Sequence, residues 1–145
     1  MYRHILVATD GSELSDKALR QGFELAKGLG AQATVITVSP TFRTFSGDAY
    51  MATVTPDQFR DDCRAEAQRI LTAAREAASK AGVPCEGVHV EDDRPYQAII
   101  DMATKKGCDL IVMASHGRKG VSALLLGSET TKVLTHTQIP VLVCR

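Results

Sequence analysis

The chain has 145 residues, enough for one domain with a full hydrophobic core that needs neither disulfides nor a structural metal. Its 17 Lys and Arg balance its 17 Asp and Glu without a block of one sign, which argues against a general attraction to DNA or acidic membranes. No apolar run approaches the roughly 18 residues that span a bilayer, and the N-terminal run is interrupted too soon, at Asp10, for a signal peptide. We therefore expect a single cytoplasmic domain over residues 1–145.

The four cysteines are widely spaced, with no CxxC pair and no paired histidines that would complete a zinc site. Free cysteines usually behave as small buried apolar residues. The sequence therefore predicts reduced, structural thiols and no metal centre. These residues are Cys63, Cys85, Cys108 and Cys144.

The first predicted unit is a short strand followed by an amphipathic helix. The apolar run 4–8 stops at the turn 9–12, whose Thr, Asp, Gly and Ser are typical of a helix start. Apolar residues then recur with helical spacing as far as Leu29, and Gly28 and Gly30 are expected to end the helix.

A second strand is predicted at 34–38, where β-branched residues dominate. Residues 39–54 show no steady period, and so long a connection in a compact domain is usually functional or mobile. Thr55 and Pro56 then begin a helix that runs to Ala81. The larger side chains of the connection could shield a ligand or contact a partner. These are Phe42, Phe45, Tyr50 and Met51.

The remaining elements alternate in the same way. Strands are expected at 85–90, 110–113 and 141–144, and helices at 95–107 and 128–135. Alternating strands and helices of these lengths favour a doubly wound parallel sheet with right-handed crossovers. The predicted fold class is therefore α/β, with five parallel strands and helices on both faces.

The segment from Ala114 to Thr130 combines several features of a phosphate site. It follows the most apolar strand, contains glycines, and ends where Ser128 opens a helix. Backbone N–H groups converge at such a turn, and the helix dipole adds partial positive charge. Side chains of Arg118, Lys119 and Lys132 could screen phosphate charge or belong to a solvated face. The glycines are Gly117, Gly120 and Gly127.

In doubly wound sheets a ligand lies beyond the carboxyl ends of the strands, where the strand order reverses. If the first strand lies beside the fourth, the turn 8–12 and the loop 114–128 face each other across one crevice. Two motifs about 100 residues apart would then form a single nucleotide site.

The sequence resembles the universal stress protein family over essentially its full length. The resemblance rests on HILVATDGSELSDKAL at the start, on TVSP after the second strand, and on SHGRKGVSALLLGSETTKVLTHTQIPVLV at the end. Nucleotide-binding members carry Gly, two residues, Gly, nine residues, then Gly with Ser or Thr. Gly117, Gly127 and Ser128 match this pattern, whereas its first position is Ala114.

The resemblance implies strand order 3-2-1-4-5, an ATP or AMP site with Mg²⁺, and a role as a nucleotide-dependent stress sensor or adaptor. It also implies a homodimer formed through strand 141–144, which agrees with the bare apolar edge that this strand presents. The implied ligand residues lie at the ends of the first, second and fourth strands and at the start of the last helix. They are Ala8, Thr9, Asp10, Val38, Met113, Ala114, Ser115, His116, Gly117, Arg118, Lys119, Gly120, Gly127, Ser128, Glu129 and Thr130.

Several of these residues also have structural interpretations. Asp10 bonds a ribose hydroxyl or caps the first helix, and the two matching glycines serve the phosphates or the turn itself. Ser128 is expected to be an N-cap, a role that competes with phosphate contact for the same hydroxyl. His116 is expected near the ribose, because no nucleophile with an acidic orienting group accompanies it.

Alanine at position 114 is harmless if the backbone there has negative φ, which we expect. A left-handed conformation would instead cost roughly 1–2 kcal/mol.

Three other functions were compared with nucleotide sensing. A non-nucleotide interaction module of the same family is the main alternative. An adenylating ATP pyrophosphatase is disfavoured, since those enzymes carry Ser-Gly-Gly-x-Asp-Ser where this chain has Thr9-Asp10-Gly11-Ser12-Glu13. A dinucleotide oxidoreductase is disfavoured because GxGxxG does not follow the first strand. With no Walker lysine, we expect at most slow hydrolysis or self-phosphorylation, at Ser128 or Thr130.

Overall fold

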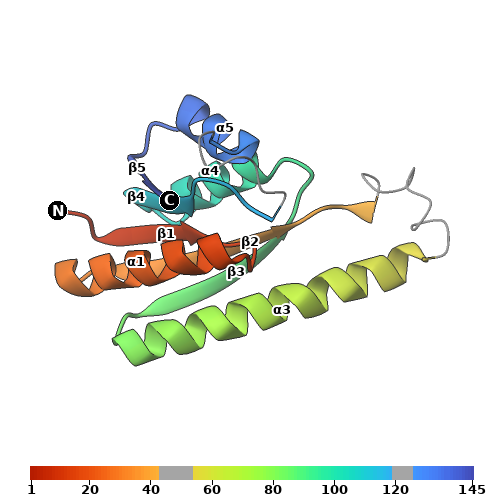
Figure 1. Cartoon of the computed structure of the whole chain (residues 1–145), viewed down its shortest axis with the longest axis horizontal. Coiled ribbons are helices and arrows are strands. Elements are labelled where there is room, and N and C mark those ends of the chain that lie inside the picture. Colours follow the sequence, from red (N-terminus) through yellow and green to blue (C-terminus); the bar gives the residue numbers. More distant parts are fainter. Residues whose placement is uncertain (43–53, 119–125) are drawn as a thin grey trace.

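The computed structural model describes residues 1–42, 54–118 and 126–145. Five parallel strands form one sheet in the order β3-β2-β1-β4-β5, with a helix in each crossover (Figure 1). The predicted α/β class and strand order are therefore confirmed. The strands are β1 (His4–Ala8), β2 (Gln32–Ser39), β3 (Cys85–Glu91), β4 (Leu110–Ala114) and β5 (Val141–Cys144).

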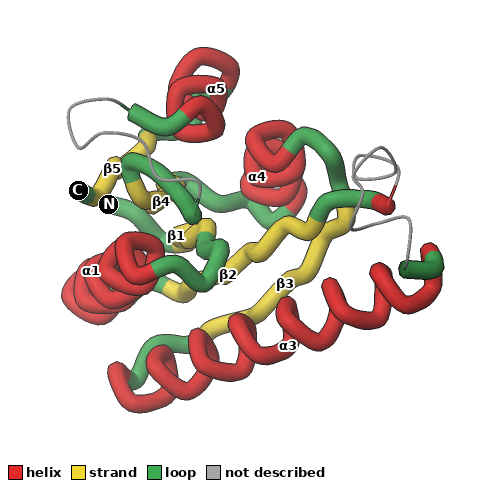
Figure 2. The backbone as a smooth tube through the Cα atoms, turned by 45° about the vertical axis from the view of Figure 1, so that its right-hand side comes forward, coloured by secondary structure: helices red, strands yellow, loops and turns green. Residues whose placement is uncertain are grey.

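Within the described residues, the helices α1, α3, α4 and α5 lie in two layers, one on each face of the sheet (Figure 2). On one face, α1 (Glu13–Leu29) and α3 (Pro56–Ala81) cover a core that includes Ile5, Val35 and Val112. On the other face, α4 (Pro95–Lys105) and α5 (Ser128–His136) cover Leu6, Ile36 and Ile111. Alternation of side chains along the strands thus supplies two separate cores.

The helix ends follow the expected chemistry with one shift. The hydroxyl of Ser12 accepts the Ser15 N–H at the start of α1, and the hydroxyl of Thr55 accepts the Gln58 N–H at the start of α3. Gly30 ends α1 in the left-handed conformation, at φ 65°. Gly28 lies inside the last turn of α1, so Gly30 alone is the C-cap.

All four cysteines are free. Two of them, Cys108 and Cys144, are buried, and Cys63 and Cys85 are partly buried. Burial, followed by the charge of Asp109, raises the pKa of Cys108 to about 11. None of the helices in the described ranges is long and apolar enough to cross a membrane.

Candidate nucleotide site

The segments that follow β1 and β4 meet at the carboxyl edge of the sheet. These two strands pair in parallel, with Ile5 opposite Leu110 and Val7 opposite Val112. Beyond their ends, the backbone N–H of Arg118 donates to Oδ2 of Asp10 over 2.9 Å. The turn after β1 and the loop after β4 therefore meet, as the sequence predicts for neighbouring strands.

Asp10 holds both sides of this junction. Its Oδ1 accepts the Ser12 N–H at 2.9 Å while its Oδ2 accepts the Arg118 N–H. Partial burial acts to raise the pKa of Asp10, but the bonds from Ser12 and Arg118 outweigh it and hold that pKa below the usual value. Asp10 is therefore a carboxylate at neutral pH, and it also supports the start of α1.

Gly117 approaches the same carboxylate closely. A β-carbon at position 117 would overlap Oδ2 of Asp10. A larger residue would therefore push the Asp10 carboxylate aside and disturb its bond to Arg118.

The backbone at Ala114 and Gly127 explains how the glycine loop returns to the sheet. Ala114 is the last residue of β4, and no non-glycine residue of the described chain has positive φ. The expected negative φ at Ala114 is thus confirmed, so alanine brings no backbone strain. Gly127 donates its N–H to the carbonyl of Ser115 over 2.6 Å. A β-carbon on Gly127 would lie 3.1 Å from both this oxygen and the Cα of His116.

The start of α5 differs from the prediction at one residue. Gly127 is the N-cap, so the expected N-cap role of Ser128 is wrong. Ser128 is the first helical residue and is exposed. The hydroxyl of Thr130 is buried and donates to the Ala114 carbonyl over 2.9 Å, which fastens α5 to β4. The hydroxyl proton of Thr130 is therefore already used within the fold.

Glu129 and Lys132 of α5 are committed to a neighbouring helix. Oε2 of Glu129 accepts the Tyr96 N–H over 2.8 Å, which satisfies an amide in the first turn of α4. Lys132 lies 3.5 Å from Oε1 of Glu129 and 5.5 Å from the centre of the Tyr96 ring. This contact between helices 33 residues apart leaves no periodic signal in the sequence.

The side chain of Arg118 points toward the helix layer of α1 and α3, on the face of the sheet opposite α5. Its guanidinium Nη2 lies 2.8 Å from Oε1 of Glu66 on α3. Sequence reasoning missed Glu66, because it lies in the middle of a helix whose charges look like an ordinary solvated face. Lys119 and Gly120 lie outside the described residues, as do Phe45, Tyr50 and Met51.

The adenosine end of the predicted site is formed by the ends of β1, β2 and β4. Met113 is buried in the core on the α4 side of the sheet, and Ala8 and Val38 are partly buried against that core. Thr9 is buried, and its hydroxyl bonds that of Ser15 at 3.0 Å. Ser115 is also buried, and its hydroxyl lies 3.3 Å from Nδ1 of His116.

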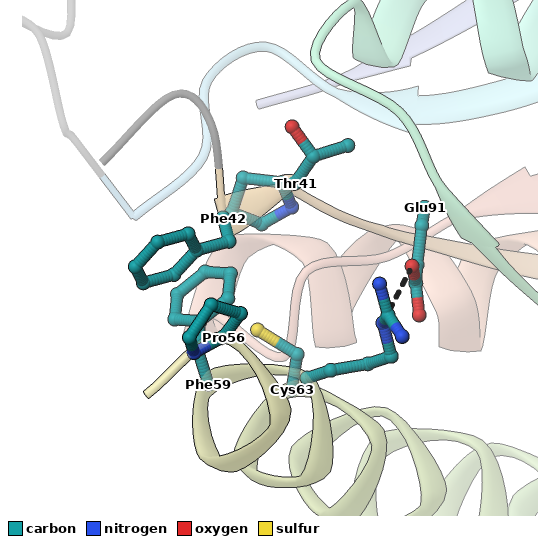
Figure 3. Close-up of a pocket in the computed structure, with 8 residues that line it drawn as sticks. Thr41, Phe42, Pro56, Phe59, Cys63 and Glu91 are labelled. Carbon is teal, nitrogen blue, oxygen red and sulfur yellow. Dashed lines mark ion pairs between the residues drawn. The ribbon is translucent and has the colours of Figure 1, made fainter. Parts of the chain in front are cut away.

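A small hollow, separate from the predicted nucleotide site, lies between α3 and the end of β2 (Figure 3). It encloses about 80 Å³ and is bordered by Thr41, Phe42, Phe59 and Cys63. Phe42 and Phe59 pack edge to face, with ring centres 5.7 Å apart. Phe42 thus lies against α3, and none of the residues that border this hollow belongs to the glycine loop.

The universal stress protein family model matches residues 1–145. The chain belongs to the universal stress protein family. It is 34% identical over 149 residues to the universal stress protein YxiE of Bacillus subtilis, and the match covers 100% of both chains.

Two solved structures extend this comparison. The hypothetical protein MJ0577 superposes with a TM-score of 0.80 at 25% identity, covering 99% of this chain and 96% of that one. A universal stress protein in complex with cAMP superposes with a TM-score of 0.74 at 27% identity, covering 99% and 97%. A member with this fold therefore binds an adenine nucleotide.

Proposed function

We propose that this universal stress protein binds an adenine nucleotide, ATP or AMP with Mg²⁺, and acts as a nucleotide-dependent sensor or adaptor in the stress response. The observation that carries the proposal is the meeting of Asp10, Gly117 and the start of α5 beyond the carboxyl ends of β1 and β4. The solved relative that holds cAMP supports the ligand class.

Val38 supplies a donor and an acceptor for the base. The Ile36 carbonyl faces β1, since it accepts the Thr9 N–H, whereas the Ser39 carbonyl accepts the Asp92 N–H on the β3 side. Backbone groups alternate along a strand, so those of Val38 face the β1 side. Because β1 ends at Ala8, no strand continues beside them. An N–H and a C=O side by side match the acceptor and donor edge of adenine.

The phosphates are assigned to the first turn of α5. The first amides of a helix have no acceptor within the helix, and those of Ser128, Glu129 and Thr130 stand at the positive end of its dipole. Gly127 is assigned no hydrogen bond to phosphate, because its own N–H is bonded to the Ser115 carbonyl. Its contribution is the lack of a side chain at this turn. When bound, Mg²⁺ would be held mainly by phosphate oxygens and water.

Binding, and not turnover, is the proposed activity. Among the two hydroxyls considered for phosphoryl transfer, only that of Ser128 is exposed, because the Thr130 hydroxyl is buried against β4. Any slow self-phosphorylation is therefore assigned to Ser128.

We further propose a homodimer through the outer edge of β5. Pro140 and Cys144 direct their carbonyls to β4, so Val141 and Val143 direct their backbone groups outward. An apolar edge with outward N–H and C=O groups is a template for a second copy of the strand.

The nucleotide proposal is tested by calorimetric titration of the wild type and of Gly117→Ala with ATP, AMP and cAMP. The added β-carbon overlaps the Asp10 carboxylate, so affinity is expected to fall about tenfold, as for an overpacking cost of about 1.4 kcal/mol. Gly28→Ala is the matched control, because its β-carbon meets open space. A substitution at Gly127 is less selective, since a side chain there also presses on Ser115 and His116.

Two results would contradict the proposal. A wild type that takes up no nucleotide at millimolar concentration favours the interaction module without a ligand. Unchanged affinity in Gly117→Ala, with the fold intact, would place the ligand outside this site.

A further inference from the structure

The guanidinium of Arg118 lies across the end of β1 and docks on α3. A β-carbon at Gly11 would lie 2.8 Å from Nη2 of Arg118, so the side chain passes directly over this turn. Its Nη2 then reaches Oε1 of Glu66 at 2.8 Å. The conformation places the positive charge on the α1 and α3 layer, whereas α5 lies on the opposite face of the sheet.

The carboxylate of Glu66 is held in position to bind the Arg118 guanidinium. Arg69 donates to both oxygens of Glu66, from Nε over 2.9 Å and from Nη2 over 2.7 Å, which fixes the carboxylate in place. These bonds lower the pKa of Glu66 to about 2, so it is ionised throughout the physiological range. The Arg118 and Glu66 side chains are 52% and 41% exposed, so the pair is weak enough to be broken by a competing anion.

The phosphate chain of a bound nucleotide is such an anion. At the first turn of α5 it would lie near enough to Arg118 to compete with Glu66 for the guanidinium. Arg118 follows His116 by two residues, and His116 packs against Gly127 at the first turn of α5. An arginine side chain at this position can be turned toward either layer. While the Arg118 side chain is bonded to Glu66, only backbone amides would contact the phosphate chain. Once released from Glu66, Arg118 would add a cation that binds phosphate in a bidentate manner.

We propose that Glu66 is a specificity-determining residue, which withholds Arg118 from the phosphate chain and so weakens the preference of the site for nucleoside polyphosphates over adenosine. The inference rests on the nucleotide function proposed above. Glu66 acts through the guanidinium of Arg118, whereas the base is assigned to Val38 and the ribose to Asp10, so its effect is expected on the phosphates. Binding of a triphosphate would in turn separate Arg118 from Glu66, which couples ligand occupancy to α3.

The test compares ATP with adenosine on the full chain. Glu66→Gln is expected to tighten ATP binding about three- to fivefold, the range for breaking an exposed ion pair, and to change adenosine binding less than twofold. Adding Arg118→Gln to Glu66→Gln is expected to abolish the gain, and this double variant has the same net charge as the wild type. Glu76→Gln is the matched control, because Glu76 is an exposed carboxylate on α3 that lies beyond the Glu66 cluster.

The sign of the effect separates this role from a structural one. Loosening of the loop in Glu66→Gln would weaken ATP and adenosine together, and that result overturns the inference. An equal gain in Glu76→Gln also overturns it, since the effect would then be one of overall charge. If the wild type binds ATP and the ratio of ATP to adenosine affinity is unchanged in Glu66→Gln, this inference alone fails. If the wild type binds no nucleotide, the proposed function fails with it.

Discussion

The carboxylate of Asp10 joins two segments that lie 108 residues apart in the chain. One oxygen serves the turn before α1, and the other serves the loop after β4. The sequence interpretation offered a cap or a ribose ligand for this residue. In the structure the carboxylate first organises the two backbones, and each oxygen keeps a second lone pair for a ligand.

Asp10 is expected to contribute stability that depends on pH. Its folded pKa lies below its ordinary value of 3.8, so the contribution is fully present above that value and is lost as the pH falls through the folded pKa. Asp10→Asn should cost about 1 kcal/mol of unfolding free energy at neutral pH, the usual size for a charge-assisted hydrogen bond that remains partly solvated.

Urea unfolding of the wild type and Asp10→Asn across this pH range measures the difference. The two curves should converge below pH 3.8. Asp61→Asn, at an exposed site on α3, should follow the wild type at every pH. A constant gap between wild type and Asp10→Asn down to the most acidic point would show that the charge of Asp10 is not the source.

At the scale of elements, the order and extent of the strands and helices could be predicted because each obeys a local rule. The periods of 2 and 3.6 residues, the caps Ser12 and Thr55, and Gly30 are all local signals. The contacts of Glu66 and Glu129 are not, since their partners lie 52 and 33 residues away. Ser128 was misplaced by one position because Ser and Gly are both ordinary N-caps, and the Gly127–Ser115 bond decides between them.

The link between α5 and α4 is expected to stabilise both helices. Arg94, at the N-cap of α4, makes no side-chain capping bond, so the Glu129 carboxylate supplies the missing acceptor at Tyr96. Glu129→Ala should therefore lower the free energy of unfolding by about 1 kcal/mol, as loss of a helix cap does. The midpoint of urea unfolding should fall with an unchanged slope.

The control for this change is Glu24→Ala, an exposed acidic residue on α1. It removes the same charge and should shift the midpoint little. Equal losses in Glu24→Ala and Glu129→Ala would show that the bond to Tyr96 contributes nothing beyond charge.

At the scale of the whole molecule, the sheet has two edges with different protection. The seven-residue β3 packs against α3, whereas the four-residue β5 packs against α1 and leaves Leu142 exposed. The length and apolar character of β5 were visible in the sequence. The direction of its outward N–H groups was not, because it depends on the register with β4.

That register supplies a selective test of the homodimer. Val143→Pro removes an outward N–H and leaves the bonds of β5 to β4 in place, as proline on an edge strand does. The wild type is expected to sediment as a dimer and Val143→Pro as a folded monomer. Val143→Lys, which keeps the N–H but adds charge to the edge, should weaken the dimer as well. Dimers of full strength in both variants would place the interface elsewhere.

The pairing of β1 with β4 also determines the stage of synthesis at which the proposed nucleotide could first be bound. The proposed site needs the first dozen residues of the chain and the first turn of α5, which begins at Ser128. During synthesis from the N-terminus, the proposed site therefore stays incomplete until the residues of α5 have left the ribosome. A nucleotide that binds there would stabilise only chains that have been synthesised past this helix.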